Sequence, residues 1–211
     1  MILALDAMPP SPWKNGGGLT REIAADPPGS GLDEFHWRLS LADIQPGAFD
    51  FSRFPGVERH TLVLGPGLSL APPGAPRSAL RAVAPLSSLR LEGEEAWQAV
   101  LKGAPIQAFN LMLRRGQASG AVAAYTTPAR LPGARVMRAL CCTQGRARMR
   151  IGADALELPA GSVALLRGAQ AEAEAVLEPL LPNTLVLGAT VDLPSGPDAS
   201  PGAGRTPSPL A

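Results

Sequence analysis

The side chains with the clearest chemical potential are cations in the first half of the chain. Lys14 stands beside Asn15 at the start of a glycine run, and Arg38 and Arg59 follow in separate segments. Lysine and arginine bind carboxylates through charge-assisted hydrogen bonds. These residues therefore predict a site for a small anion, if the fold brings the segments together.

The glycine run, Gly16 to Gly18, admits two interpretations. Without a Cβ, glycine adopts positive φ and lets a ligand approach the backbone N–H groups closely. The same run also fits a tight turn into a strand that begins near Leu19. A phosphate-binding P-loop is excluded because no Gly-Lys-Ser/Thr sequence and no helix follow.

Polar side chains alternate with apolar ones in the segment from Phe35 to Leu41. A strand points successive side chains to opposite faces, so Arg38 and Ser40 share the face opposite Trp37 and Leu39. That face lies either toward solvent or toward a barrel lumen. An arginine in a lumen would need an anionic partner, because an unpaired buried charge costs several kcal/mol.

Asn110 repeats this arrangement, since it opposes Phe109 and Leu111 in an apolar run. Separate segments that each carry a polar group opposite an apolar stripe most simply meet across one barrel. We therefore expect Lys14, Arg38, Arg59 and Asn110 to converge on one cavity, with the glycine run at its edge.

The sequence offers few residues that could bind a metal or act as a catalytic nucleophile. The only histidines are His36 and His60, and the second half has none, so we expect no metal and no other cofactor. No Gly-x-Ser-x-Gly elbow is present. Cys141 and Cys142 are adjacent in an apolar run, which indicates two reduced thiols rather than a strained vicinal disulfide.

Composition excludes several classes of partner. The 211 residues carry 19 Lys and Arg against 18 Asp and Glu, so no overall charge favours nucleic acid or an anionic membrane. Arg146, Arg148 and Arg150 form a basic stripe, but without interleaved aromatics it is typical of a solvated strand face. No apolar run is long enough to span a membrane, and the N-terminus lacks the pattern of a secretory signal. We expect a cytoplasmic protein.

Turn residues indicate the fold class. The 23 glycines and 23 prolines separate short alternating runs, and no segment keeps a helical period over twelve residues. Each half repeats a rhythm of strands and glycine turns. The pattern predicts an all-β protein, a bicupin of two consecutive jelly-roll barrels.

The halves are expected to divide near the middle of the chain. Residues 1–115 form the barrel with the pocket and residues 116–191 a mainly structural barrel. Residues 192–211 are rich in Pro, Gly, Ser and Ala and have little to bury, which predicts a flexible tail.

Four motifs in register resemble the HutD/Ves family, bacterial cupin-like proteins often linked to histidine utilisation. The resemblance covers roughly residues 1–190. The matching residues are Trp13, Lys14, Asn15, Gly16, Gly17, Gly18, Thr20 and Glu22, then Trp37, Arg38, Ser40 and Ala42, then Phe54, Pro55, Gly56 and Arg59, and finally Phe109, Asn110, Met112 and Arg115. One departure is Ala108, where the family usually has Asp.

The resemblance implies a bicupin with a polar pocket near these motifs. The function it favours is binding of a small anionic metabolite of histidine degradation, for sensing or sequestering, with a homodimer as one option for assembly. Ligand contacts would come from Lys14, Asn15, Gly16, Gly17, Thr20, Glu22, Arg38, Ser40, Arg59 and Asn110. The alternative is a metal-free isomerase or hydrolase with Glu22 as general base. A pocket that has become vestigial in an interaction module is a third option.

Overall fold

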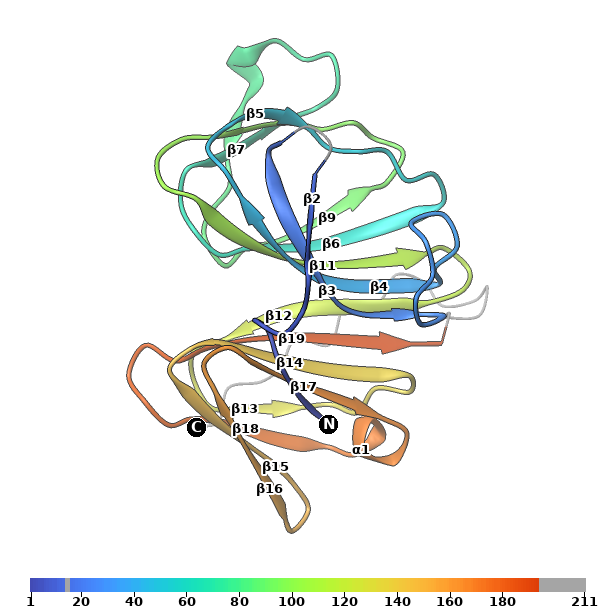
Figure 1. Cartoon of the computed structure of the whole chain (residues 1–211), viewed down its shortest axis with the longest axis vertical. Helices are drawn as coiled ribbons and strands as arrows, with labels where there is room; N and C mark the ends of the chain where they lie inside the picture. Colours follow the sequence, from blue (N-terminus) through green and yellow to red (C-terminus); the bar gives the residue numbers. More distant parts are fainter. Residues whose placement is uncertain (14–15, 194–211) are drawn as a thin grey trace. The chain divides into compact units, whose positions relative to one another are not determined.

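The computed structural model describes residues 1–13 and 16–193, and these residues are almost entirely β-structure (Figure 1). The exceptions are a four-residue helix, α1 (Ala169–Glu172), and one 3-10 turn, η1 (Arg77–Ala79). The prediction of an all-β protein is confirmed. The tail beyond residue 193, like Lys14 and Asn15, lies outside the described residues.

The chain divides into two compact units. The N-terminal unit is Met8–Arg115, and the C-terminal unit combines Met1–Ala7 with the chain from Gly116 onward. Residues 1–7 were expected in the first barrel, but Ile2–Ala4 pairs antiparallel with an edge strand of the C-terminal unit. Such long-range pairing satisfies backbone groups that an edge strand leaves open.

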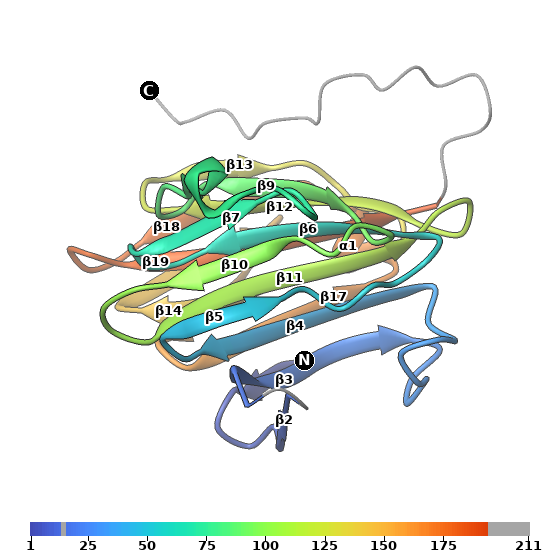
Figure 2. The same ribbon diagram turned by 90° about the horizontal axis from the view of Figure 1, so that it is seen from above.

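Two sheets build the N-terminal unit. The larger has the order β2-β3-β4-β11-β6-β9, which Figure 2 shows from β2 and β3 at one edge to β9 at the other. Its strands are β2 (Pro10–Pro12), β3 (Gly18–Asp26), β4 (Trp37–Ile44), β11 (Ile106–Arg114), β6 (Val57–Val63) and β9 (Ser88–Glu92). The smaller has the order β5-β10-β7-β8, with β5 (Gly47–Asp50), β10 (Gln98–Leu101), β7 (Leu68–Ala71) and β8 (Arg81–Ala82).

Two further sheets build the C-terminal unit. One has the order β1-β17-β14-β19-β12, with β1 (Ile2–Ala4), β17 (Ser162–Arg167), β14 (Met137–Gln144), β19 (Leu185–Asp192) and β12 (Ser119–Tyr125). The other has the order β13-β18-β15-β16, with β13 (Ala129–Leu131), β18 (Ala175–Pro179), β15 (Arg146–Ile151) and β16 (Asp154–Pro159). In both units the strand ladders stay open, so each is the double-sheet form of a jelly roll rather than a closed barrel.

Apolar side chains from both sheets of each unit meet between them. In the N-terminal unit Ala42, Val63 and Ala108 of the large sheet pack with Leu70 and Leu101 of the small one. The opposite face of the large sheet is buried as well, because Trp37, Leu39 and Leu111 are each at most 2% exposed. Both faces at the centre of this sheet are therefore buried, so polar side chains there have little contact with solvent.

Candidate functional site

A row of polar side chains crosses four strands of the large N-terminal sheet. Glu22 on β3 lies opposite Ser40 on β4, Ser40 opposite Asn110 on β11, and Asn110 opposite Thr61 on β6. Directly opposed residues project from the same face of a sheet. This face also carries Ala42, Ala108 and Val63, which pack against the small sheet. The polar row therefore faces the interior of the unit, which is one of the two orientations that the sequence left open.

Hydrogen bonds fix the middle of this row. Thr61 donates its hydroxyl proton to Asn110 Oδ1 at 2.8 Å, and Asn110 Nδ2 donates to the carbonyl of Ala108 at 3.2 Å. Thr61 and Ser40 are only 5% and 3% exposed. Asn110 thus keeps a second N–H proton, and Ser40 its hydroxyl, as groups able to contact a ligand.

Arg38 and Arg59 occupy the next row, on either side of Met112. Arg38 lies opposite Met112 from β4, and Arg59 lies opposite it from β6. Two strand spacings separate the two arginine backbones by about 10 Å. Both guanidinium groups thus project from the face that carries Ser40 and Asn110.

The two arginines differ in their partners. Arg38 Nε donates to Glu22 Oε2 at 2.7 Å, and the Arg38 side chain is 15% exposed. This ion pair neutralises Arg38. A general base needs a free carboxylate, whereas the carboxylate of Glu22 is paired with Arg38.

Arg59 is held by aromatic rings instead of a carboxylate. Its guanidinium carbon lies 5.1 Å from the ring centre of Phe51 and 5.2 Å from that of Phe54, and Nη1 donates to the Ser52 carbonyl at 3.1 Å. No ion pair joins it to any carboxylate in residues 1–13 or 16–193. Burial lowers the pKa of Arg59 to about 10. A half-buried cation of this kind is the natural place for an anion to bind.

The glycine run lies at the other end of the sheet. Gly18 pairs with Ile44, six residues along β4 from Arg38, which corresponds to about 20 Å. Gly16 adopts φ 71° and donates its N–H to the carbonyl of Trp13 at 3.0 Å, and Gly17 accepts from the Gln45 N–H at 2.9 Å. These bonds fit the interpretation of a tight turn between β2 and β3.

Thr20 lies on β3 between the glycine run and Glu22. Its Oγ1 accepts a hydrogen bond from Trp13 Nε1 at 2.8 Å, and the Trp13 ring packs edge-on against Phe49 at 5.8 Å. Thr20 therefore orients an aromatic side chain of the core, although it shares the inner face with Glu22. The structure thus places Glu22, Arg38, Ser40, Arg59 and Asn110 on one face, with Thr20 in the row beside Glu22 but bonded to Trp13, and sets Gly16 and Gly17 apart at the end of the sheet.

Sequence reasoning missed three members of this group: Thr61, Phe51 and Phe54. A signal for Thr61 was present, since it follows Arg59 by two positions on one strand and so shares its face. Phe51 and Phe54 lie outside the strands; Phe54 shares a family motif with Arg59, but no spacing rule places the ring of Phe51 over it.

Both histidines are engaged away from this group. His36 Nδ1 lies 3.0 Å from Asp26 Oδ2, and the side chain is 45% exposed. His60 contacts Glu58, which also pairs with Arg90. Among the described residues no three His, Cys, Asp or Glu side chains gather as metal ligands would.

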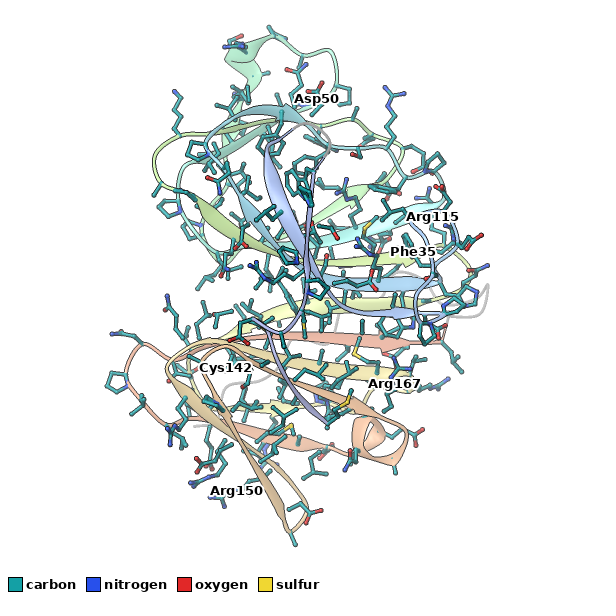
Figure 3. All side chains as sticks on the ribbon, viewed as in Figure 1. Phe35, Asp50, Arg115, Cys142, Arg150 and Arg167 are labelled. Atoms are coloured by element: carbon teal, nitrogen blue, oxygen red, sulfur yellow. The ribbon has the colours of Figure 1, made fainter. Side chains whose placement is uncertain are left out.

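The arginine stripe of β15 is paired rather than free. Arg146 and Arg148 pair with Glu157, and Arg150, on the β15–β16 hairpin in Figure 3, pairs with Glu178 at 3.5 Å. These pairs remove most of the positive charge that a nucleic acid would recognise. The stripe is thus an ion-paired strand face.

A small open pocket of about 200 Å³ lies elsewhere in the N-terminal unit. It is lined by Asp50, Arg77 and Gln98 together with apolar residues of β5 and β10 and with Leu80. The pocket contains none of the residues that the sequence analysis singled out, and its charged groups are exposed to solvent.

The two double-sheet units define a cupin-like protein. Known structures agree: a cupin 2 conserved barrel domain protein from Leptotrichia buccalis superposes with a TM-score of 0.55 at 6% identity, covering 92% of this chain and 96% of that one. At this identity the likeness concerns the fold alone.

Within that class the chain belongs to the HutD family, whose sequence model matches residues 5–179. The structure of HutD from Pseudomonas fluorescens SBW25 superposes with a TM-score of 0.74 at 23% identity, covering 92% of this chain and 99% of that chain. A conserved protein of unknown function from Pseudomonas aeruginosa PAO1 gives a TM-score of 0.76 at 28% identity, covering 91% and 98%.

Curated relatives extend the match to the Ves proteins. An uncharacterised 21.2 kDa protein in the hutC 3′ region of Pseudomonas putida is 42% identical over 112 residues, which is 53% of this chain and 56% of the relative. Protein Ves of Escherichia fergusonii is 38% identical over 109 residues, covering 51% and 54%. The chain thus spans about half the length of the curated relatives it matches. No helix in the described part of the chain is long and apolar enough to cross a membrane.

Proposed function

We propose that this protein binds a small carboxylate metabolite of histidine degradation inside its N-terminal unit, and that it senses or sequesters this ligand. The observation that carries the proposal is Arg59. Its half-buried guanidinium has aromatic rings and one carbonyl around it, but no carboxylate of the described residues. A ligand carboxylate would supply the missing charge.

The neighbouring groups indicate the rest of the ligand. Asn110 and Ser40 lie between Arg59 and the Glu22–Arg38 pair, on the same face. Glu22 is 37% exposed and keeps lone pairs for an N–H donor. A compact molecule with a carboxylate at one end, for Arg59, and a nitrogen donor at the other, for Glu22, fits this arrangement.

The link to histidine breakdown comes from relatives. One relative is encoded in a hutC 3′ region, and the family is HutD. Histidine and the products of its breakdown carry a carboxylate together with nitrogen groups, which is the chemistry that Arg59 and Glu22 can recognise. A binding role rather than catalysis is favoured because Glu22, the residue assigned as general base, is paired with Arg38.

Isothermal titration calorimetry with histidine, its deaminated acrylate and glutamate tests the proposal. We expect at least one to bind to the wild type and to lose tenfold or more in affinity in Arg59→Met. Arg53→Met is the matched control, since Arg53 is an exposed arginine of the loop that precedes β6 and its loss removes the same charge. Equal losses in both variants, or no binding by any of the three ligands, would overturn the proposal.

A further inference from the structure

A second arginine without a counter-charge lies inside the C-terminal unit. Arg138, on β14, is 1% exposed and shares its face with Leu140 and Cys142, which belong to the apolar core of this unit. Its Nη2 donates to the carbonyls of Pro132 and Ala173, the latter at 2.9 Å. Its Nε and Nη1 are buried and have no hydrogen-bond partner among the described residues.

Two carbonyl oxygens do not replace a counter-ion. A carbonyl contributes a partial charge, whereas a guanidinium removed from water loses several kcal/mol of hydration. Burial lowers the pKa of Arg138, and the titratable group that acts on it is the phenol of Tyr125. No carboxylate of the described residues forms an ion pair with it. The interior of this unit therefore carries a positive charge that its own described side chains leave uncompensated.

Arg138 lies two strands from the β12 edge of its sheet. Across the sheet Arg138 lies opposite Thr190, and Thr190 opposite Ala121 on the edge strand β12. Ala121 is exposed and Thr190 half-buried. The two side chains between Arg138 and that edge in this row are therefore small.

Tyr125 is a large side chain of β12 on the same face as Ala121. It is half-buried on β12, and its ring lies over Gly188, where an added Cβ would stand 2.6 Å from Cε2 and 3.3 Å from the hydroxyl oxygen. Gly188 therefore makes room for the ring. Because Nε and Nη1 of Arg138 are out of reach of solvent, an anion gains access only if a neighbouring group moves, and Tyr125 is a half-buried side chain of the edge strand on this face.

We propose that the C-terminal unit holds a second anion site, in which Arg138 binds a small monovalent carboxylate and the Tyr125 hydroxyl donates a second hydrogen bond after the ring shifts. One guanidinium neutralises one negative charge, so a bound dianion would leave one net negative charge buried in the site. The site is independent of the N-terminal unit and of the function proposed for it.

The sole tyrosine of the chain makes a direct test available. Protein labelled with 3-fluorotyrosine gives one fluorine NMR resonance, from position 125. Acetate is the probe, and sodium sulfate at equal ionic strength is the control for salt. We expect acetate to shift the resonance in a saturable way, and sulfate to leave it within a small fraction of that shift.

Variants assign the response to Arg138. Arg138→Met keeps the length of the side chain without its charge, and should weaken acetate binding at least tenfold by this readout. Arg59→Met, in the other unit, should leave the response unchanged. If Arg138→Met does not fold, Tyr125→Phe takes its place, with thermal stabilisation by acetate as the readout; we expect this stabilisation to be reduced because one donor is lost. An unchanged resonance in the wild type, or a response that persists in Arg138→Met, overturns the proposal.

Discussion

Arg59→Met should separate binding from stability. The wild-type guanidinium is half-buried without a carboxylate among the described residues, and burial lowers the pKa of Arg59 from its ordinary value to about 10. That difference corresponds to an unfavourable contribution of about 3 kcal/mol to folding, an upper limit because solvent screens a half-buried charge. The rings of Phe51 and Phe54 offset part of it, by about 0.5 to 2 kcal/mol each.

Methionine keeps an apolar side chain of similar length between the two rings. The substitution removes the desolvation cost together with the cation–π attraction, and we expect the free energy of unfolding to change by no more than about 1 kcal/mol, in the stabilising direction. Urea denaturation measures this change, and calorimetry measures the loss of carboxylate binding. A variant that is destabilised by about 2 kcal/mol or more would refute the reasoning, because Arg59 would then be a structural clamp on the two rings.

Three further predictions follow from the same geometry. Glu22→Gln removes the carboxylate partner of Arg38 and should lower the free energy of unfolding by about 1 to 2 kcal/mol in urea; unchanged stability would mean that the pair contributes little. Burial raises the pKa of Cys141 to about 12, so its thiol should react slowly with a disulfide reagent at pH 8 until the protein is denatured, and immediate reaction would contradict its burial. Carboxylate affinity should stay level from pH 7 to about 9 and fall above about pH 10, where Arg59 loses its proton, whereas affinity that is constant to higher pH would assign binding to another cation.

The sequence allowed the faces of single strands to be predicted, because alternation depends on local geometry. Arg38 and Ser40 do lie opposite Trp37 and Leu39, and Asn110 does lie opposite Phe109. The question left open, solvent or lumen, is answered by the residues that share their face with the apolar core.

Register and loop packing could not be predicted in this way. The opposition of Glu22 and Ser40 depends on a bulge between Glu22 and Ala24, and one residue more or less would turn Glu22 to the other face. The stacking of Phe51 on Arg59 is a contact between a loop and a strand, which alternation does not encode. These non-local choices decide which arginine is paired and which is left without a carboxylate.

The pairing of β1 with β17 has a consequence for synthesis. The Met1 amine donates to the Leu165 carbonyl, 164 residues later in the chain. β1 therefore leaves the ribosome before the whole N-terminal unit is made, and closes its sheet only after β17 has emerged. The entropy of closing a loop grows slowly with its length, and here the intervening residues fold into a compact unit first, which shortens the effective loop. A translating ribosome thus carries a finished N-terminal unit while β1 is still unpaired and available to any other open sheet edge until its own partner appears.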